Sequence, residues 1–321
     1  MSSSSTPATA PLENPGAVVK KLLSEAQSEG QGATVRRSIG RYQQFHLFSI
    51  WIELDSESFD GVRFWLNCRH ELRNLDPFLM LDEFSVSKPA GFPDHPHRGF
   101  ETVTCMLHGA FTHQDFSGHK GTIRTGDGGP WHRALRDAGG RRRSEGLQLW
   151  INLAATDKMI EPRYQEVQSK DISRAAKDGV EVPIITGEAF GVRSPVYTRT
   201  PTMYMDFTMQ PGSQLHQPIP AGWNAFVYII EGEGSFGSEK AAPATAHHCL
   251  VLGADRDGLS VWNRSGAPLR FALAAGKPLK EPVVQQGPFV MNTRAEIQQA
   301  MEDYYYGRNR FEKATQWISA V

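Results

Sequence analysis

Gly91-Phe-Pro-Asp-His-Pro-His-Arg-Gly-Phe-Glu-Thr-Val-Thr104 places two histidines, His95 and His97, one residue apart and just before a strand-like run. Alternate residues of an extended chain point to the same side, so both imidazoles can face one point. Pro96 between them favours an extended backbone and supports that geometry. Two neutral ring nitrogens at the entry of a β-barrel suit a divalent metal ion. The alternative is a pair of surface histidines in a proline loop, and a metal site needs two or more further ligands from elsewhere in the chain.

Strand patterns dominate the chain from about residue 97 onward. Short β-branched and aromatic runs are separated by Gly, Pro and Asp, which indicates all-β sandwiches or barrels and not alternating strand–helix units. The predicted strands are Phe100–Leu107, Gly146–Leu153, Glu181–Ile185, Thr202–Met209, Ala225–Glu231, His248–Leu252, Leu259–Asn263 and Leu269–Ala274. Residues 99–125 and 223–253 share a strand–turn–strand order, so two copies of one barrel fit the length.

One helical segment is predicted, from Thr293 to about Ile318. Thr293 and Glu296 have the spacing of a capping box, and Gly307 divides the segment. Apolar residues recur every three to four positions, which predicts a face that packs back on the barrels. These residues are Ile297, Met301, Tyr304, Tyr305, Phe311, Ala314 and Ile318.

The composition is that of a globular chain without a strong charge bias. Of 321 residues, 40% are hydrophobic and 21% charged, and the net charge is −1. This balance excludes a generally basic nucleic-acid coat and gives no electrostatic reason to expect a membrane partner. Cys68, Cys105 and Cys249 are far apart and lack metal-ligand spacing, so a reducing compartment is expected. The first residues, MSSSSTPATAPLENPG, do not resemble a secretory signal, and we expect a flexible tail over residues 1–29.

Several longer motifs resemble the pirin family in order and spacing. They are FPDHPHRGFETVT, GLQLWINL, KMIEPRYQE, VYTRTPTMYMDF, QPIPAGW and EPVVQQGPFVMNT. The resemblance implies an all-β fold of two tandem cupin barrels (double-stranded β-helix or jelly roll) with a C-terminal helical segment. The implied divisions are an N-terminal cupin over 30–165, a C-terminal cupin over 180–290 and the helical segment over 291–321. The resemblance also implies one Fe(II) in the N-terminal cupin, with His95 and His97 as its first two ligands, and a C-terminal cupin without metal.

The chain departs from the family where the other two ligands, a His and a Glu, are expected. The family motif is close to GDVQWMTAGRGIVHSEMP, but residues 125–139 read TGDGGPWHRALRDAG. Suitable codons for MTAGRGIVHSEMP, read two bases in, encode residues 127–138 in full. We therefore interpret residues 127–140 as the metal motif translated in the wrong frame, which leaves half of the Fe(II) site. The alternative is a divergent protein that binds no metal.

A second departure is the segment 42–69, which is rich in aromatic residues and has no strand or helix period. Its removal joins Arg41 to His70 and restores the family pattern, and its ends can encode splice signals. We interpret it as a non-native insert, a retained intron, and expect it to be poorly packed and outside both barrels. The alternative is an aromatic insertion that binds a partner.

Other candidate side chains favour structural roles. Glu101 is expected to be a paired structural carboxylate, with a role beside the metal as the alternative. Cys105 alternates with apolar neighbours and is expected in the core. His247 and His248 are adjacent and point to opposite faces of a strand, so they do not ligate together. The remaining candidates are His108, His113 and His119 in turns, His132 and Arg141–Arg143 in the altered stretch, and His216 in the second barrel.

Three functions are compatible with these features. The resemblance implies a mononuclear iron dioxygenase that acts on quercetin-type flavonols with O₂. It also implies an iron-binding nuclear co-regulator that binds transcription factors. A metal-deficient product of a faulty gene model is the third. We expect a monomer in nucleus and cytoplasm, with no direct nucleic-acid binding and no membrane association.

Sequencing the transcript tests the interpretation of residues 127–140. We expect a copy that reads in the family frame across this stretch and lacks the codons for 42–69. A transcript that matches the chain throughout both segments would contradict the interpretation.

Overall fold

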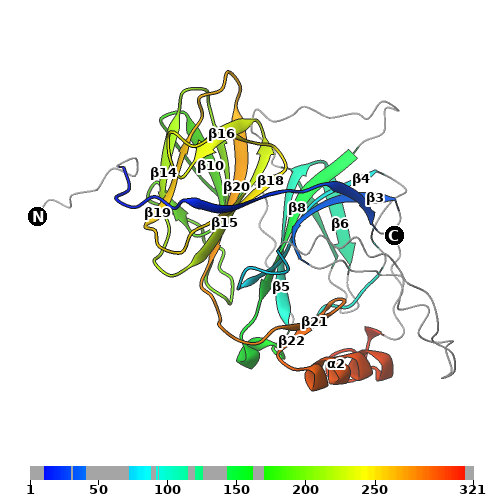
Figure 1. The fold of residues 1–321 in the computed structure, drawn as a ribbon. Helices are drawn as coiled ribbons and strands as arrows, with labels where there is room; N and C mark the ends of the chain where they lie inside the picture. Colours follow the sequence, from blue (N-terminus) through cyan, green and yellow to red (C-terminus); the bar gives the residue numbers. More distant parts are fainter. Residues whose placement is uncertain are drawn as a thin grey trace, which may run out of the picture.

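The computed structural model describes residues 11–29, 32–40, 72–87, 92, 94–114, 120–125, 143–161 and 170–314. Two β-barrels lie side by side, with one α-helix beneath the first of them (Figure 1). The all-β fold with two barrels and a C-terminal helix is confirmed. The segments 42–69 and 127–140 lie outside the described residues, so the expectations for them stay predictions.

The N-terminal barrel is built on a sheet whose described strands have the order β2-β3-β4-β8-β5, with β6 and β7 paired separately. A short 3₁₀ turn, η1, follows the last strand. The elements are β2 (Ala26–Glu29), β3 (Ala33–Ile39), β4 (Phe78–Ser87), β5 (Phe100–His108), β6 (Ala110–Gln114), β7 (Lys120–Arg124), β8 (Arg143–Asn152) and η1 (Ala155–Asp157).

The C-terminal barrel pairs a sheet of described order β1-β18-β15-β20-β13-β10-β9 with a second sheet of order β14-β19-β16-β17. Strands β11 and β12 form a separate pair. The elements are β1 (Val18–Leu23), β9 (Ser173–Lys177), β10 (Val180–Thr186), β11 (Glu188–Ala189), β12 (Val192–Arg193), β13 (Thr202–Met209), β14 (Gln214–Pro218), β15 (Asn224–Glu231), β16 (Glu233–Phe236), β17 (Ala244–Thr245), β18 (His248–Leu252), β19 (Gly258–Trp262) and β20 (Leu269–Gly276). Strand β9 already belongs to this barrel, ahead of the expected start at residue 180.

The two ends of the chain are exchanged between the barrels. Strand β1 pairs with β18 of the C-terminal barrel, and the next strand, β2, joins the N-terminal barrel. The expected flexible tail is therefore wrong for residues 18–29. The VVKKLL sequence of β1 does not alternate between apolar and polar residues, so it gave no strand pattern. β1 is an edge strand that buries Leu22 and leaves the apolar Val19 and Leu23 exposed. At the other end, β21 (Val284–Gln286), β22 (Phe289–Met291) and α2 (Arg294–Tyr306) follow the C-terminal barrel but lie below β5 (Figure 1).

Helix α2 begins at the predicted capping box and ends at Gly307, where the sequence predicted a division. Residues 308–313 are not helical, so the expected helical segment to about Ile318 is wrong there, and residues 315–321 lie outside the described residues. The Thr293 hydroxyl accepts a hydrogen bond from the Glu296 amide, and the Glu296 carboxylate accepts one from the Thr293 amide. Gly307 ends the helix in the left-handed region, with φ of 62°, a conformation that costs glycine little. The predicted apolar face packs against β22, as Ile297 is buried in one cluster with Phe289. Tyr305 is the exception: it is 68% exposed, because it lies about 100° around the helix from Tyr304. The described helix is too short and too polar to cross a membrane.

A third apolar core joins the barrels, in addition to the core inside each of them. Leu147, Leu149 and Ile151 alternate along β8 and face the outer side of the C-terminal sheet. There they meet Tyr204 and Phe226, which are nearly fully buried. Each side chain of this kind contributes about 1.5–3 kcal/mol when it leaves water, so the barrels bind each other as one unit.

Replacing Phe226 by Ala should destabilise the whole chain. Its ring meets that of Phe78 edge-on across the two sheets, with centroids 5.2 Å apart. We expect the free energy of unfolding to fall by about 3–5 kcal/mol, because a large buried ring leaves a cavity. Urea unfolding measures this. The exposed Tyr305→Ala variant is the control and should change the value by less than about 0.5 kcal/mol. A loss below about 1 kcal/mol for Phe226→Ala would show that the barrels do not depend on this contact.

Candidate metal centre

The histidine pair, His95 and His97, lies in the segment that leads into β5. The two ring centroids are 4.8 Å apart, with an angle of 54° between the ring planes. Residues 94–97 belong to no strand, and Pro96 between the histidines is buried. The structure thus brings together the two imidazoles that the His-Pro-His spacing predicted to converge.

An aromatic wall lies beside the pair. The His97 ring is 5.0 Å from that of Phe100 and 5.3 Å from that of Trp150, centroid to centroid. Phe100 and Trp150 stack on each other at 4.2 Å, and both are buried in a cluster with Val290. The Trp150 indole N–H is buried and has no hydrogen-bond partner among the described residues. The pair therefore lies against a buried apolar cluster of the N-terminal barrel.

His97 is neutral at pH 7. Desolvation by the protein around the ring, and then the charge of His95, lower the pKa of His97 to about 3. The side chain nevertheless keeps exposed surface, and solvent there screens part of the effect. The lowered pKa of His97 favours ligation, because a neutral imidazole has a lone pair to offer a metal ion.

The backbone after the pair is fixed against β22. The Arg98 amide donates to the Pro288 carbonyl at 3.2 Å, and the Val290 amide donates to the Arg98 carbonyl at 3.0 Å. Gly99 has φ of 89°, and a Cβ there would lie 1.8 Å from the Val290 oxygen, so only glycine fits. These contacts fix the direction in which the chain enters β5.

A buried lysine, Lys158, bonds to the same part of the backbone, where β22 meets the start of β5. The Lys158 ammonium donates to the Gly99 carbonyl at 2.9 Å, the Asn152 side-chain oxygen at 2.6 Å and the Val290 carbonyl at 3.2 Å. Burial lowers the pKa of Lys158 to about 8. All three of its protons have acceptors, so Lys158 ties the ends of β5 and β8 to β22.

The histidine pair offers two donors of a kind that a metal ion could use. Imidazole suits iron and similar ions, so the pair fits the kind of donor that such an ion needs. The described ranges contain no cluster of three or more His, Cys, Asp or Glu side chains that could hold a metal ion. Two donors are fewer than the three protein ligands of the two-His-one-carboxylate sites that bind non-haem iron. Any further ligand would have to come from outside the described residues, where residues 126–142 lie.

The other candidates have structural surroundings. One Glu101 oxygen accepts a hydrogen bond from the Arg199 amide at 3.0 Å, as expected of a structural carboxylate. Cys105 is partly buried and packs against the core between the barrels, in line with the prediction, and burial raises the pKa of its thiol to about 12. His216 is buried against Ser260, and His247 contacts Glu83 while His248 contacts Thr245. His108 ends β5, as its predicted place in a hairpin turn requires, and His113 lies in β6. His119, His132, Arg141 and Arg142 lie outside the described residues.

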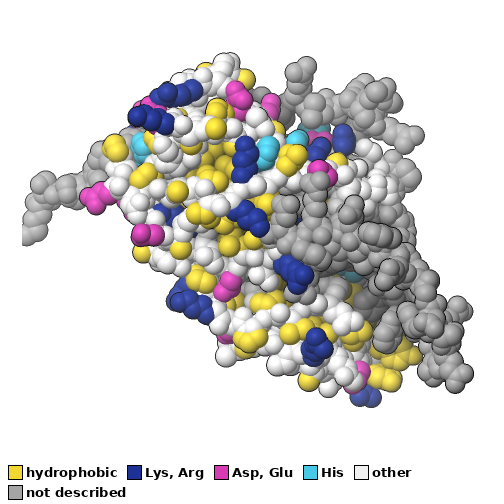
Figure 2. Space-filling model, in the orientation of Figure 1, with side chains coloured by type: hydrophobic (Ala, Val, Ile, Leu, Met, Phe, Trp, Pro, Cys, Tyr) yellow, Lys and Arg dark blue, Asp and Glu magenta, His cyan; other side chains and the backbone are white. Residues whose placement is uncertain are grey.

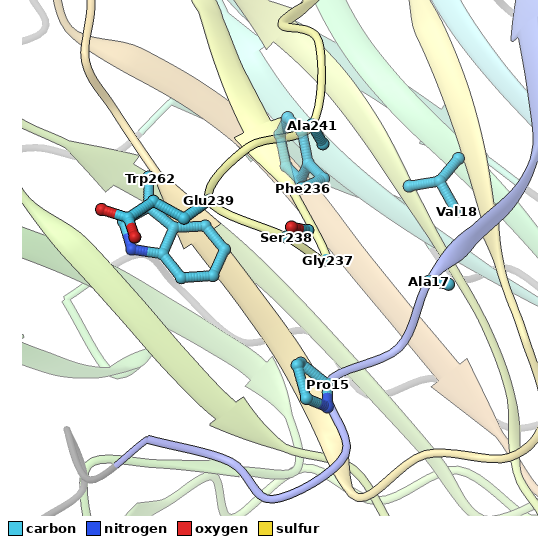
Figure 3. Close-up of a pocket in the computed structure, with 9 residues that line it drawn as sticks. All are labelled: Pro15, Ala17, Val18, Phe236, Gly237, Ser238, Glu239, Ala241 and Trp262. Carbon is cyan, nitrogen blue, oxygen red and sulfur yellow. The ribbon is translucent and has the colours of Figure 1, made fainter.

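A cavity of about 590 Å³ lies elsewhere, on the C-terminal barrel (Figure 3). It is lined by Pro15, Val18, Phe236, Glu239 and Trp262, among others, and contains neither histidine of the pair. Figure 2 shows Lys and Arg side chains as separate groups over the coloured part of the surface, with Asp and Glu side chains scattered among them and no continuous basic area on that face. Neither the cavity nor the surface charge indicates a second functional site.

Two β-barrels in tandem, the first with a histidine pair at the start of one of its strands, define a bicupin. Family models agree: "Pirin" matches residues 62–151, and "Pirin C-terminal cupin domain" matches residues 204–310. The chain belongs to the pirin family. A pirin-like protein of Solanum lycopersicum is 60% identical over 96% of this chain and 98% of its own length.

Solved structures show the same architecture. Quercetin 2,3-dioxygenase from Acinetobacter baumannii has a TM-score of 0.71 and 26% identity, over 92% of this chain and 98% of that one. The bacterial pirin YhhW from Escherichia coli, solved in complex with nickel(II), has a TM-score of 0.52 and 16% identity, over 81% of this chain and 99% of that one. The second likeness concerns the fold alone.

The pKa of His97 makes a pH prediction. Its folded value lies below the ordinary value of 6.5, so the unfolded chain binds the proton first as the pH falls. Its contribution to stability is complete above about pH 6.5 and is lost as the pH falls toward 3. In the metal-free protein we expect the His97 ring resonance to titrate with a midpoint below 5. NMR measures this, and His97→Ala identifies the resonance. A midpoint near 6.5 would contradict the prediction.

Proposed function

We propose that this pirin-family bicupin is an iron-dependent dioxygenase of quercetin-type flavonols, with His95 and His97 as two of its metal ligands. The observation that carries the proposal is the contact between the two imidazole rings at the entrance to β5. The likeness to a quercetin 2,3-dioxygenase over nearly the whole chain supports the substrate class.

The side chains around the pair suit this reaction. The buried rings of Phe100 and Trp150 pack beside the His97 ring, and the neutral His97 imidazole has a lone pair to offer a metal ion. An iron ion bound there would act as a Lewis acid and as the meeting point for the flavonol and O₂. Two imidazoles leave such an ion mostly hydrated, since affinity depends on the number of ligands and on their preorganisation. We therefore propose that the chain as written binds Fe(II) more weakly than a pirin with all four family ligands.

Metal analysis of two matched proteins tests both parts of the proposal. One is the chain as written, and the other is repaired to the family frame over residues 127–140. We expect about one iron per repaired chain at a stoichiometric amount of chelator, and at least about tenfold less in the chain as written, since two ligands are lost. Quercetin-dependent O₂ uptake should follow the iron content.

The double variant His95→Ala, His97→Ala in the repaired chain is the control and should lose both iron and O₂ uptake. One iron per chain as written, held against the chelator, would contradict the incomplete site. A repaired chain with a full iron content and no O₂ uptake with quercetin would contradict the dioxygenase.

A further inference from the structure

The Arg98 side chain, next to His97, is enclosed by the C-terminal segment, residues 284–314. Its Nη1 donates to the Asp303 carboxylate at 2.6 Å, and its Nη2 donates to the Asn309 carbonyl. The guanidinium also lies 4.3 Å from the centre of the Phe311 ring. Arg98 is 8% exposed and Asp303 1% exposed, so water screens this ion pair little.

Asp303 is held as a charged group. Its second oxygen accepts hydrogen bonds from the side-chain amides of Gln299 and Asn309, each at 2.9 Å. Burial alone would raise the pKa of Asp303, but the hydrogen bonds from Gln299, Arg98 and Asn309 lower it below the ordinary value. Asp303 is thus fixed by its own helix and by the turn after it, and presents one oxygen to Arg98.

The segment that carries the pair lies outside the strands and leads into β5 through Arg98 and Gly99. Residues 94–97 make no ladder contacts among the described strands, and the first ladder partner after them is that of Phe100 with Asn152. Arg98 is the first residue after the pair whose backbone and side chain are both bonded to the C-terminal segment. The direction of the His97 ring depends on the backbone at that point.

We propose that Asp303 is a positioning residue for the metal pair: through Arg98 it holds the backbone that aims His97 at the ion. This inference rests on the proposed metal site at His95 and His97. Groups behind metal ligands set the ligand orientation, and their loss lowers metal affinity. By thermodynamic linkage, a metal ion at the pair should favour the docked state of helix α2 to the same extent.

The test compares full-length chains that carry Asp303→Asn with a matched control, Glu302→Gln. Glu302 is exposed on the same helix, and among the described residues its side chain accepts one hydrogen bond, from Gln298. The probe is Cu(II), which N-donor sites bind more tightly than other divalent first-row ions. Its electron paramagnetic resonance spectrum counts the imidazole nitrogens, and the double variant His95→Ala, His97→Ala shows which signal comes from the pair.

We expect Asp303→Asn to weaken Cu(II) binding by about 10- to 100-fold and to change the nitrogen hyperfine pattern. A purely structural role would lower the melting temperature but leave both properties of the folded protein unchanged. Cu(II) should slow hydrogen exchange in α2 of the unchanged chain and not in Asp303→Asn. If Asp303→Asn does not fold, Gln299→Met decides, because it removes one donor to Asp303 and leaves the ion pair in place.

Cu(II) affinity within twofold of the Glu302→Gln control would overturn the inference, for Asp303→Asn or for its substitute Gln299→Met. If the unchanged chain gives no signal from the pair, the metal site itself fails, which is a failure of the proposed function. Hydrogen exchange of residues 94–100 then decides the positioning role. Exchange at least tenfold faster in Asp303→Asn, with β13 and β20 unchanged, supports it, and equal exchange overturns it.

Discussion

The sheets of the two barrels pack face to face through buried apolar side chains. Leu147, Leu149 and Ile151 point away from the interior of their own barrel and lie against Tyr204 and Phe226 of the other. A sheet with one apolar outer face needs a partner, and here each barrel is the partner of the other. Within this arrangement β22, which follows the C-terminal barrel in sequence, lies beside Arg98, just before β5.

The exchanged ends of the chain make that arrangement cooperative. β1 completes a sheet of the C-terminal barrel, while β22 and α2 pack against the segment that carries the histidine pair. Gly99, Lys158 and the Arg98–Asp303 ion pair all lie where β22 and α2 meet the start of β5. The geometry of the centre in the N-terminal barrel is thus set in part by residues that follow the C-terminal barrel in sequence.

Much of the fold could be predicted from local patterns, and the failures have physical causes. β13 and β18 have the predicted bounds, since Gly, Pro or charged residues flank their apolar runs. Strand β4 was not predicted, because its FLMLDEF run is buried on both faces and does not alternate between apolar and polar residues. The His-Pro-His spacing was enough to predict that the rings of His95 and His97 converge. The Arg98–Asp303 ion pair could not be predicted, because the two residues are 205 positions apart. The available signal was that Asp303 is an acidic residue on the apolar side of a helix, which indicates a buried partner.

We infer that His95 and His97 hold a metal ion together at the entrance of the N-terminal cupin. Anomalous diffraction at the iron edge tests this inference, with crystals of the chain that is repaired over residues 127–140 and grown with Fe(II). One peak is expected between the two rings, at about 2.0–2.2 Å from a nitrogen of each, a distance typical of metal–imidazole bonds. A peak only at His216 in the C-terminal barrel, or no peak between His95 and His97, would contradict it.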